Sequence, residues 1–194
     1  MREEGNNVVV TANYKLGCFD QAVWTISPDG TAAIDFTYNF SGVVDLMGVM
    51  FDYPEDKVLS KRWVGDGPYR VWQNRLHGPQ LGVWENEYND PIPAESFTYP
   101  EFKGYFANVQ WMTLETQEGM ISICNRTPQN YVGVYQPRDG RDGLLYTFPV
   151  TGISLMKVIP PVRNKVNTTD LIGPSSQAFW ADGEYGGGIT LKFE

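Results

Sequence analysis

Apolar and polar residues alternate in short segments along this chain. Between Thr31 and Phe40 the apolar side chains of Ile34, Phe36 and Tyr38 stand at every second position, with mostly polar residues between them. A period of two predicts a β-strand with one buried face and one solvated face. The segment is therefore expected to lie on the surface of a core rather than to cross one.

Similar segments predict further strands, and no apolar periodicity supports more than one short helix. Ser27-Pro28-Asp29-Gly30 is typical of a turn, because proline presets φ and glycine accepts positive φ. A hairpin is expected around Gln117–Gly119. The predicted strands are Val8–Lys15, Phe19–Ser27, Thr31–Phe40, Met47–Phe51, Lys57–Val64, Leu81–Tyr88, Phe106–Glu115, Met120–Asn125, Tyr131–Gln136, Leu144–Phe148, Ile153–Val158 and Gly188–Phe193.

Many short strands separated by turns predict an all-β fold, a large antiparallel β-sandwich. A length of 194 residues suits one domain. We expect residues 8–194 to form that domain, as part of a larger multidomain enzyme, and residues 1–7 to be a disordered or added start. Gly186-Gly187-Gly188 is expected to be a flexible bend before the last strand.

The charge of the chain narrows the classes of partner. The net charge of −8 argues against nucleic acid and anionic membranes, which need a basic surface. No apolar run approaches the ~20 residues of a membrane span. A neutral ligand such as a sugar is compatible with this charge. Met1–Asn7 is polar and has no apolar signal-peptide core, so periplasmic or secreted localisation would require a signal in a longer parent.

Cysteine and histidine are scarce. Cys18 and Cys124 are the only cysteines, and two buried thiols are favoured over one disulfide because free cysteines are usually buried. A single histidine and two distant cysteines do not have the spacing of a zinc site. The sequence predicts neither a metal nor another cofactor.

The segment Arg62–Asn89 contains three of the six tryptophans and the only histidine. Glycine and proline exclude a helix here, so two strands joined by a structured loop are expected. Such loops, when they carry aromatic and amide side chains, are often binding surfaces. The alternative is that the tryptophans belong to the core. They are Trp63, Trp72 and Trp84.

The same segment resembles the C-terminal β-sandwich domain of family 2 glycoside hydrolases of the β-galactosidase type. The first matching block contains Trp63, Gly65, Gly67-Pro68, Trp72, Asn74, Arg75 and Gly82-Val83-Trp84, and the second contains Pro100, Gly104, Val109 and Trp111. Three positions depart from the family pattern: Arg70 replaces a glutamate, Asn74 replaces an aspartate, and Glu101 is shifted to follow the proline directly.

The resemblance implies a supersandwich fold like that of galactose mutarotase and an accessory role. The catalytic carboxylates of the family lie in a separate barrel domain, so this chain is expected to be inactive alone. Its partners would be the other domains of the parent enzyme and a galactoside-like carbohydrate. A late loop of the family domain brings an aromatic residue to the sugar site, and Trp180 stands at a similar distance from the C-terminus.

Sugar recognition needs flat aromatic faces and polar groups that bind hydroxyls. Two sets of residues offer both, and they predict the carbohydrate site. The first set is Trp72, Asn74 and Arg75. The second is Phe179, Trp180, Asp182, Glu184 and Tyr185, of which Trp180 and Tyr185 are the predicted binding residues. Trp180 is expected in an exposed loop, with packing against the sandwich as the alternative.

Other functions remain open at this point. An independent carbohydrate-binding module would use the same aromatic residues. A mutarotase-like epimerase would need His77 as an acid or base, although a lone loop histidine is usually a solvated side chain. Glu85 and Glu87 share a predicted strand face, yet such spacing is common on solvated strands and carries little weight as a glycosidase pair.

Overall fold

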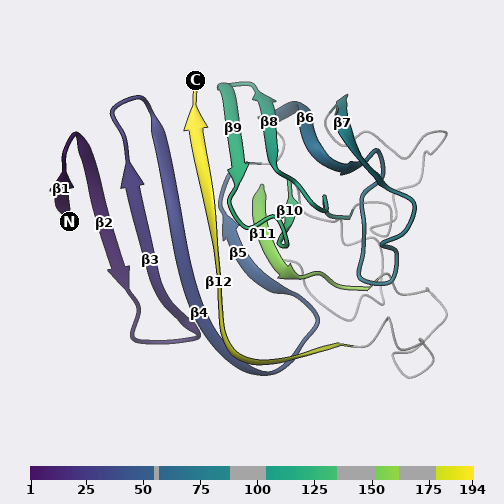
Figure 1. Ribbon diagram of the computed structural model, residues 1–194, viewed down its shortest axis with the longest axis horizontal. Coiled ribbons are helices and arrows are strands. Elements are labelled where there is room, and N and C mark those ends of the chain that lie inside the picture. The colour runs from purple at the N-terminus through teal and green to yellow at the C-terminus, as the bar shows by residue number, and fades with distance from the viewer. Residues whose placement is uncertain (55–56, 88–103, 135–151, 162–177) are drawn as a thin grey trace.

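A computed structural model of the full chain describes residues 1–54, 57–87, 104–134, 152–161 and 178–194. These residues form twelve strands in two antiparallel sheets, so the predicted all-β sandwich is confirmed (Figure 1). No described segment forms a helix with the length and apolarity that crossing a bilayer requires. The strands are β1 (Arg2–Glu4), β2 (Asn7–Asn13), β3 (Phe19–Ile26), β4 (Thr31–Val44), β5 (Met47–Phe51), β6 (Val58–Gly67), β7 (Gln80–Glu87), β8 (Trp111–Thr116), β9 (Gly119–Asn125), β10 (Tyr131–Gly133), β11 (Ile153–Val158) and β12 (Phe179–Phe193).

The large sheet has nine strands in the order β1-β2-β3-β4-β12-β9-β8-β6-β7, and the small sheet has the order β10-β11-β5. The C-terminal strand β12 lies in the middle of the large sheet, between β4 and β9 (Figure 1). Sequence-distant segments are therefore neighbours. β9 pairs only with the last part of β12, from Ile189 to Phe193. From Phe179 to Gly188, β12 pairs with β4 and with no other described strand. This extension is called the β4–β12 ribbon below.

The main core lies between the two sheets. From β4, Ile34, Phe36 and Tyr38 point into it, as their alternation with polar residues predicts. Leu155 of β11 and Val132 of β10 approach from the small sheet, and both are fully buried. Burial of apolar side chains on both sheets supplies the main driving force for this fold.

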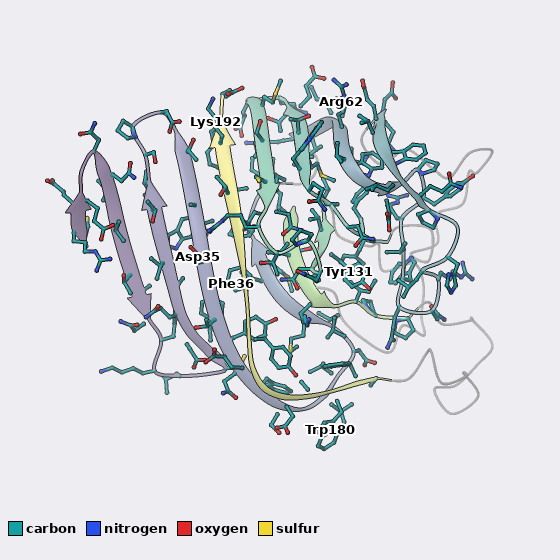
Figure 2. The ribbon with its side chains drawn as sticks, viewed as in Figure 1. Asp35, Phe36, Arg62, Tyr131, Trp180 and Lys192 are labelled. Carbon is teal, nitrogen blue, oxygen red and sulfur yellow. The ribbon has the colours of Figure 1, made fainter. Side chains whose placement is uncertain are left out.

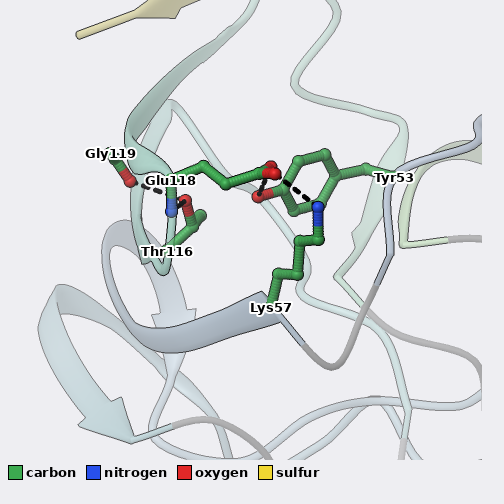
Figure 3. A network of polar contacts seen from close by, with 5 residues as sticks. All are labelled: Tyr53, Lys57, Thr116, Glu118 and Gly119. Carbon is green, nitrogen blue, oxygen red and sulfur yellow. Dashed lines mark hydrogen bonds and ion pairs between the residues drawn. The ribbon is translucent and has the colours of Figure 1, made fainter.

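Two predicted turns are present. Gly30 has a φ of 84° at the end of the Ser27–Gly30 turn, where only glycine is unstrained. The β8–β9 hairpin pairs Thr116 with Gly119, and Gly119 has a φ of 134°. The hairpin is held to the segment before β6 by Glu118, which accepts hydrogen bonds from Lys57 and from Tyr53 (Figure 3). Local turn chemistry and one charge-assisted contact therefore fix this end of the sandwich.

The last strand corrects the sequence prediction. Gly186, Gly187 and Gly188 are not a flexible bend, because all three lie inside β12 and pair with β4. A Cβ at Gly187 would stand 2.9 Å from the Phe36 ring and 2.8 Å from the amide nitrogen of Asn130. The glycines therefore permit close packing against the core rather than chain flexibility.

Other predictions are also corrected. Within residues 1–7, Arg2–Glu4 is ordered, because it forms β1 and pairs with β2. Cys18 and Cys124 are unbonded but exposed, not buried. Cys18 lies in the loop before β3, and Cys124 points outward from β9 because the alternate residues of that strand fill the core. The predicted strand Leu144–Phe148 lies outside the described residues.

Candidate functional site

The described parts of the two sequence blocks that resemble family 2 glycoside hydrolases pack against each other, while Pro100 and Glu101 lie outside the described residues. Trp63 of the first block contacts Phe106, which lies within the second, with 4.7 Å between ring centroids. Val71 and Tyr105 exchange two backbone hydrogen bonds of 2.8 and 2.9 Å. A Cβ at Gly65 would stand 3.0 Å from the backbone at Ala107 and Val109. The segments around both blocks therefore build one scaffold, and Gly65 lies where two backbones approach closely.

Trp72 belongs to this scaffold. It is 3% exposed and packs with Tyr105 at 6.0 Å between ring centroids, in a small apolar cluster that also contains Val71, Met156 and Ile159. The ring faces of Trp72 are not open to a ligand, which removes Trp72 from the predicted carbohydrate site. The alternative interpretation, that the loop tryptophans are core residues, is correct for Trp72 and for the fully buried Trp63.

Asn74 and Arg75 lie in the turn that follows Trp72. The backbones of Trp72 and Arg75 exchange hydrogen bonds of 2.9 and 3.3 Å, which closes the turn. Asn74 is half-buried, whereas Arg75 is exposed. In the described part of the chain, no hydrogen bond or ring contact joins this turn to Trp180. The structure thus does not bring the two predicted carbohydrate-binding sets together.

Trp180 is the most exposed tryptophan of the described residues, at 67%. It lies in the β4–β12 ribbon, not in a loop, and its cross-strand partner Val43 is 61% exposed. Figure 2 shows the Trp180 side chain pointing away from the sheets at the curved end of this ribbon. The predicted exposure of Trp180 is confirmed. Its predicted loop conformation is wrong, because the backbone N–H and C=O groups of this Gly-rich and acidic segment pair with those of β4.

Tyr185 holds the ribbon together. Its ring stacks on Tyr38 with 5.8 Å between centroids, and its hydroxyl oxygen accepts a hydrogen bond of 2.9 Å from the Asp182 backbone nitrogen. The Asp182 carboxylate, in turn, accepts a hydrogen bond of 3.3 Å from the Ser41 hydroxyl and stays exposed. Tyr185 therefore positions the segment beside Trp180 instead of offering an open ring face.

The remaining candidates for catalysis lie on open surfaces. Glu85 and Glu87 are exposed on one face of β7, as their spacing predicts. His77 is exposed and has no hydrogen-bond partner among the described residues. No described group of three histidine, cysteine, aspartate or glutamate residues is arranged to hold a metal ion. This arrangement places no acid and base around a common enclosed site.

Sequence reasoning missed Trp111 as a surface residue and used it only as part of the family pattern. Trp111 begins β8 and is 37% exposed on the outer face of the large sheet. The available signal was the alternation of Trp111, Thr113 and Glu115 with the buried Met112 and Leu114. That alternation places the tryptophan on the polar side of the strand.

The sequence matches no protein-family model, and no curated protein matches it significantly. The resemblance to family 2 glycoside hydrolases rests on the residues of the two blocks alone.

Proposed function

We propose that this chain is an accessory β-sandwich domain of a β-galactosidase-like family 2 glycoside hydrolase. The domain packs on the catalytic barrel of its parent and borders the sugar site through Trp180. It contributes binding and positioning, and it does not hydrolyse glycosides alone.

The observation that carries this proposal is the exposure of Trp180 on the β4–β12 ribbon. Trp180 is 67% exposed and its cross-strand partner Val43 is 61% exposed, so the two form an apolar surface that a partner domain would cover. Asp182, on the same strand, offers carboxylate oxygens to hydroxyl groups. One aromatic platform without a facing wall encloses little of a ligand, so a partner domain has to supply the second wall.

The packing of the two resembling blocks also supports the proposal. The segments that contain the two blocks form one scaffold, with Trp63 against Phe106 and the backbone of Val71 bonded to that of Tyr105.

The test is made in the natural coding sequence. An adjoining barrel domain with paired glutamates is expected, and Trp180→Ala in that protein should raise KM for an aryl β-galactoside without lowering the melting temperature. The isolated chain should show no hydrolysis of the same substrate. Hydrolysis by the pure chain that disappears on heat denaturation would contradict the proposal.

An independent carbohydrate-binding module is the second candidate, and the exposed pair of Trp180 and Val43 favours it. Affinity separates the two functions. An accessory domain should bind galactose alone at about millimolar Kd, or about 4 kcal/mol. Micromolar binding by the isolated chain, lost in Trp180→Ala, would favour the module.

A further inference from the structure

The outer face of the large sheet carries a continuous polar row. In an antiparallel sheet, directly paired residues project from the same face, so the strand register identifies the row. It contains Glu85, Arg62, Thr113, Ser122, Lys192 and Thr31, in order from β7 to β4. Five inter-strand steps of ~4.8 Å give the row a length of about 24 Å. Figure 2 shows Arg62 and Lys192 near the same end of the sheet.

A second row, more apolar, runs beside the first. It contains Val83, Val64, Trp111, Cys124, Thr190 and Ala33, again in register across the strands. Val83 is 58% exposed and Trp111 is 37% exposed. Neighbouring rows on one face are separated by two residues, or about 6.7 Å along a strand. The outer face therefore carries a polar row and, beside it, a more apolar row, both running across the strands.

Two adjoining hollows follow these rows. One, of about 460 Å³, lies over β8, β9 and β12 and is lined by Trp111, Ser122, Cys124 and Lys192 among others. The other, of about 550 Å³, is lined by Ser60, Arg62, Glu85 and Glu115 among others. Thr113 lines both hollows. Each volume lies within the ~300–1,000 Å³ of ligand sites in proteins.

The two hollows together are called the trough below. The charged side chains along the trough are of both signs. Arg62 stands opposite Glu85, and no ion pair of Arg62 occurs among the described residues, so its guanidinium donors are available in the hollow. Glu115 accepts a hydrogen bond of 2.9 Å from Ser60, and Lys192 forms an ion pair with Glu194. Donors and acceptors alternate without an excess of one sign. A neutral ligand with many hydroxyl groups meets these requirements, whereas an anionic chain would face the carboxylates.

We propose that this trough binds an extended, neutral oligosaccharide lying across the strands. Trp111 stacks on the apolar face of one sugar ring, and Arg62, Glu85 and Glu115 bind hydroxyl groups of the adjoining unit. The site is separate from the one at Trp180 and does not depend on a catalytic parent. It would serve to hold a polysaccharide near the protein.

The first test is electrophoresis of the full chain through gels containing linear galactan, mixed-linkage β-glucan, galactomannan or xylan. At least one should retard the chain. Trp111→Ala should weaken the retardation by about tenfold, equivalent to about 1.4 kcal/mol. Arg62→Ala should also weaken it. Tyr14→Ala is the matched control, because it removes another exposed aromatic side chain, one that lies between β2 and β3 and outside both hollows, and it should leave the retardation unchanged.

The two exposed cysteines provide a second readout that needs no variant. Cys124 lies in the trough, cross-strand from Trp111, whereas Cys18 lies in the loop before β3. The retarding polysaccharide should slow alkylation of Cys124 and leave alkylation of Cys18 unchanged. Peptide mapping by mass spectrometry distinguishes the two sites.

Three results would overturn the proposal. They are mobility unaffected by any of the four neutral polysaccharides, retardation by anionic polygalacturonate alone, and retardation that survives Trp111→Ala. Dimerisation of the chain that is abolished by Trp111→Ala, seen by sedimentation velocity without sugar binding, would instead assign the face to self-association. Self-association through this face would leave the proposed role of Trp180 untouched, so the failure of one proposal does not entail the failure of the other.

Discussion

Trp63 and Phe106 pack edge to face, with 4.7 Å between their ring centroids and 65° between their planes. Both side chains are at most 1% exposed. They come from strand β6 and from the segment before β8, so their contact joins the two halves of the scaffold.

Truncation of this pair should be costly. Phe106→Ala is expected to lower the free energy of unfolding by about 3–5 kcal/mol, because it removes a buried ring and leaves a cavity. In a double-mutant cycle with Trp63→Leu, the aromatic pair should show a coupling of about 0.5–1.5 kcal/mol. Urea unfolding followed by circular dichroism measures the stability of the parent chain, the two single variants and the double variant. Additive effects would mean that the rings contribute through burial alone.

Gly67 has no room for a side chain. A Cβ there would stand 2.6 Å from the indole of Trp84, whose Nε1 also donates to the Gly65 carbonyl oxygen at 3.2 Å. Gly67→Ala should therefore destabilise the fold by about 1–3 kcal/mol, as overpacking does. The control is the same substitution in a Trp84→Ala background, where thermal unfolding should show a smaller loss. An equal loss in both backgrounds would place the cause in the backbone.

Glu118 should make stability depend on acid. Its hydrogen bond from Lys57, the positive charge of Lys57 and the hydroxyl of Tyr53 lower the pKa of this carboxyl below its ordinary 4.5 (Figure 3). A lowered pKa in the folded state stabilises the fold above pH 4.5, and this contribution is lost as the pH falls through the folded-state pKa.

Glu118→Gln should consequently be less stable than the parent chain at pH 7 and equally stable in strong acid. Melting temperatures measured from pH 7 down to pH 2 provide the comparison. Glu115→Gln is a matched control on the same hairpin, because Glu115 accepts a hydrogen bond from Ser60 and forms no ion pair with a lysine in the part of the chain that the structure describes. A constant difference between Glu118→Gln and the parent at every pH would contradict this electrostatic explanation.

Tyr38 should make stability depend on alkali. Burial, and then the neighbouring Tyr185 and Cys18, raise the pKa of the Tyr38 hydroxyl from 10.0 to about 12. A raised pKa favours the folded state below pH 10, and stability falls as the pH rises from 10 toward 12, because the unfolded chain loses this proton first.

Replacement by phenylalanine tests this relation. Tyr38→Phe keeps the ring stacked on Tyr185 and removes the ionisable group, so the variant should lose less stability between pH 10 and 12 than the parent. Urea midpoints at several alkaline pH values measure the difference. Parallel curves for the two proteins would show that other groups drive alkaline unfolding.

Much of the strand structure was predictable because it depends on local patterns. Met47–Phe51 and Ile153–Val158 occur with the predicted bounds, and Thr31–Phe40 has the predicted buried face. The turn at Gly30 was also predictable, since only glycine adopts its φ without strain. Alternation and turn chemistry act between residues that are close in sequence, so they are visible without the fold.

The sites were less predictable. Trp72 and Trp111 have similar sequence surroundings of polar and apolar residues, yet one is buried under Tyr105 and the other faces solvent on β8. The difference depends on which segment packs above each ring. The same holds for the scaffold, where Gly65 requires the close approach of a backbone more than 40 residues away at Ala107.

The sequence by itself determined that this protein is an antiparallel β-sandwich with one polar face on its long strands. Only the tertiary structure decided that Gly186–Gly188 extends β12, that Cys124 is exposed, and that polar residues from six strands align into one row. The reason is that backbone pairing and packing join residues far apart in the chain. A side chain's exposure, and its neighbours in a site, are set by those partners rather than by its own sequence context.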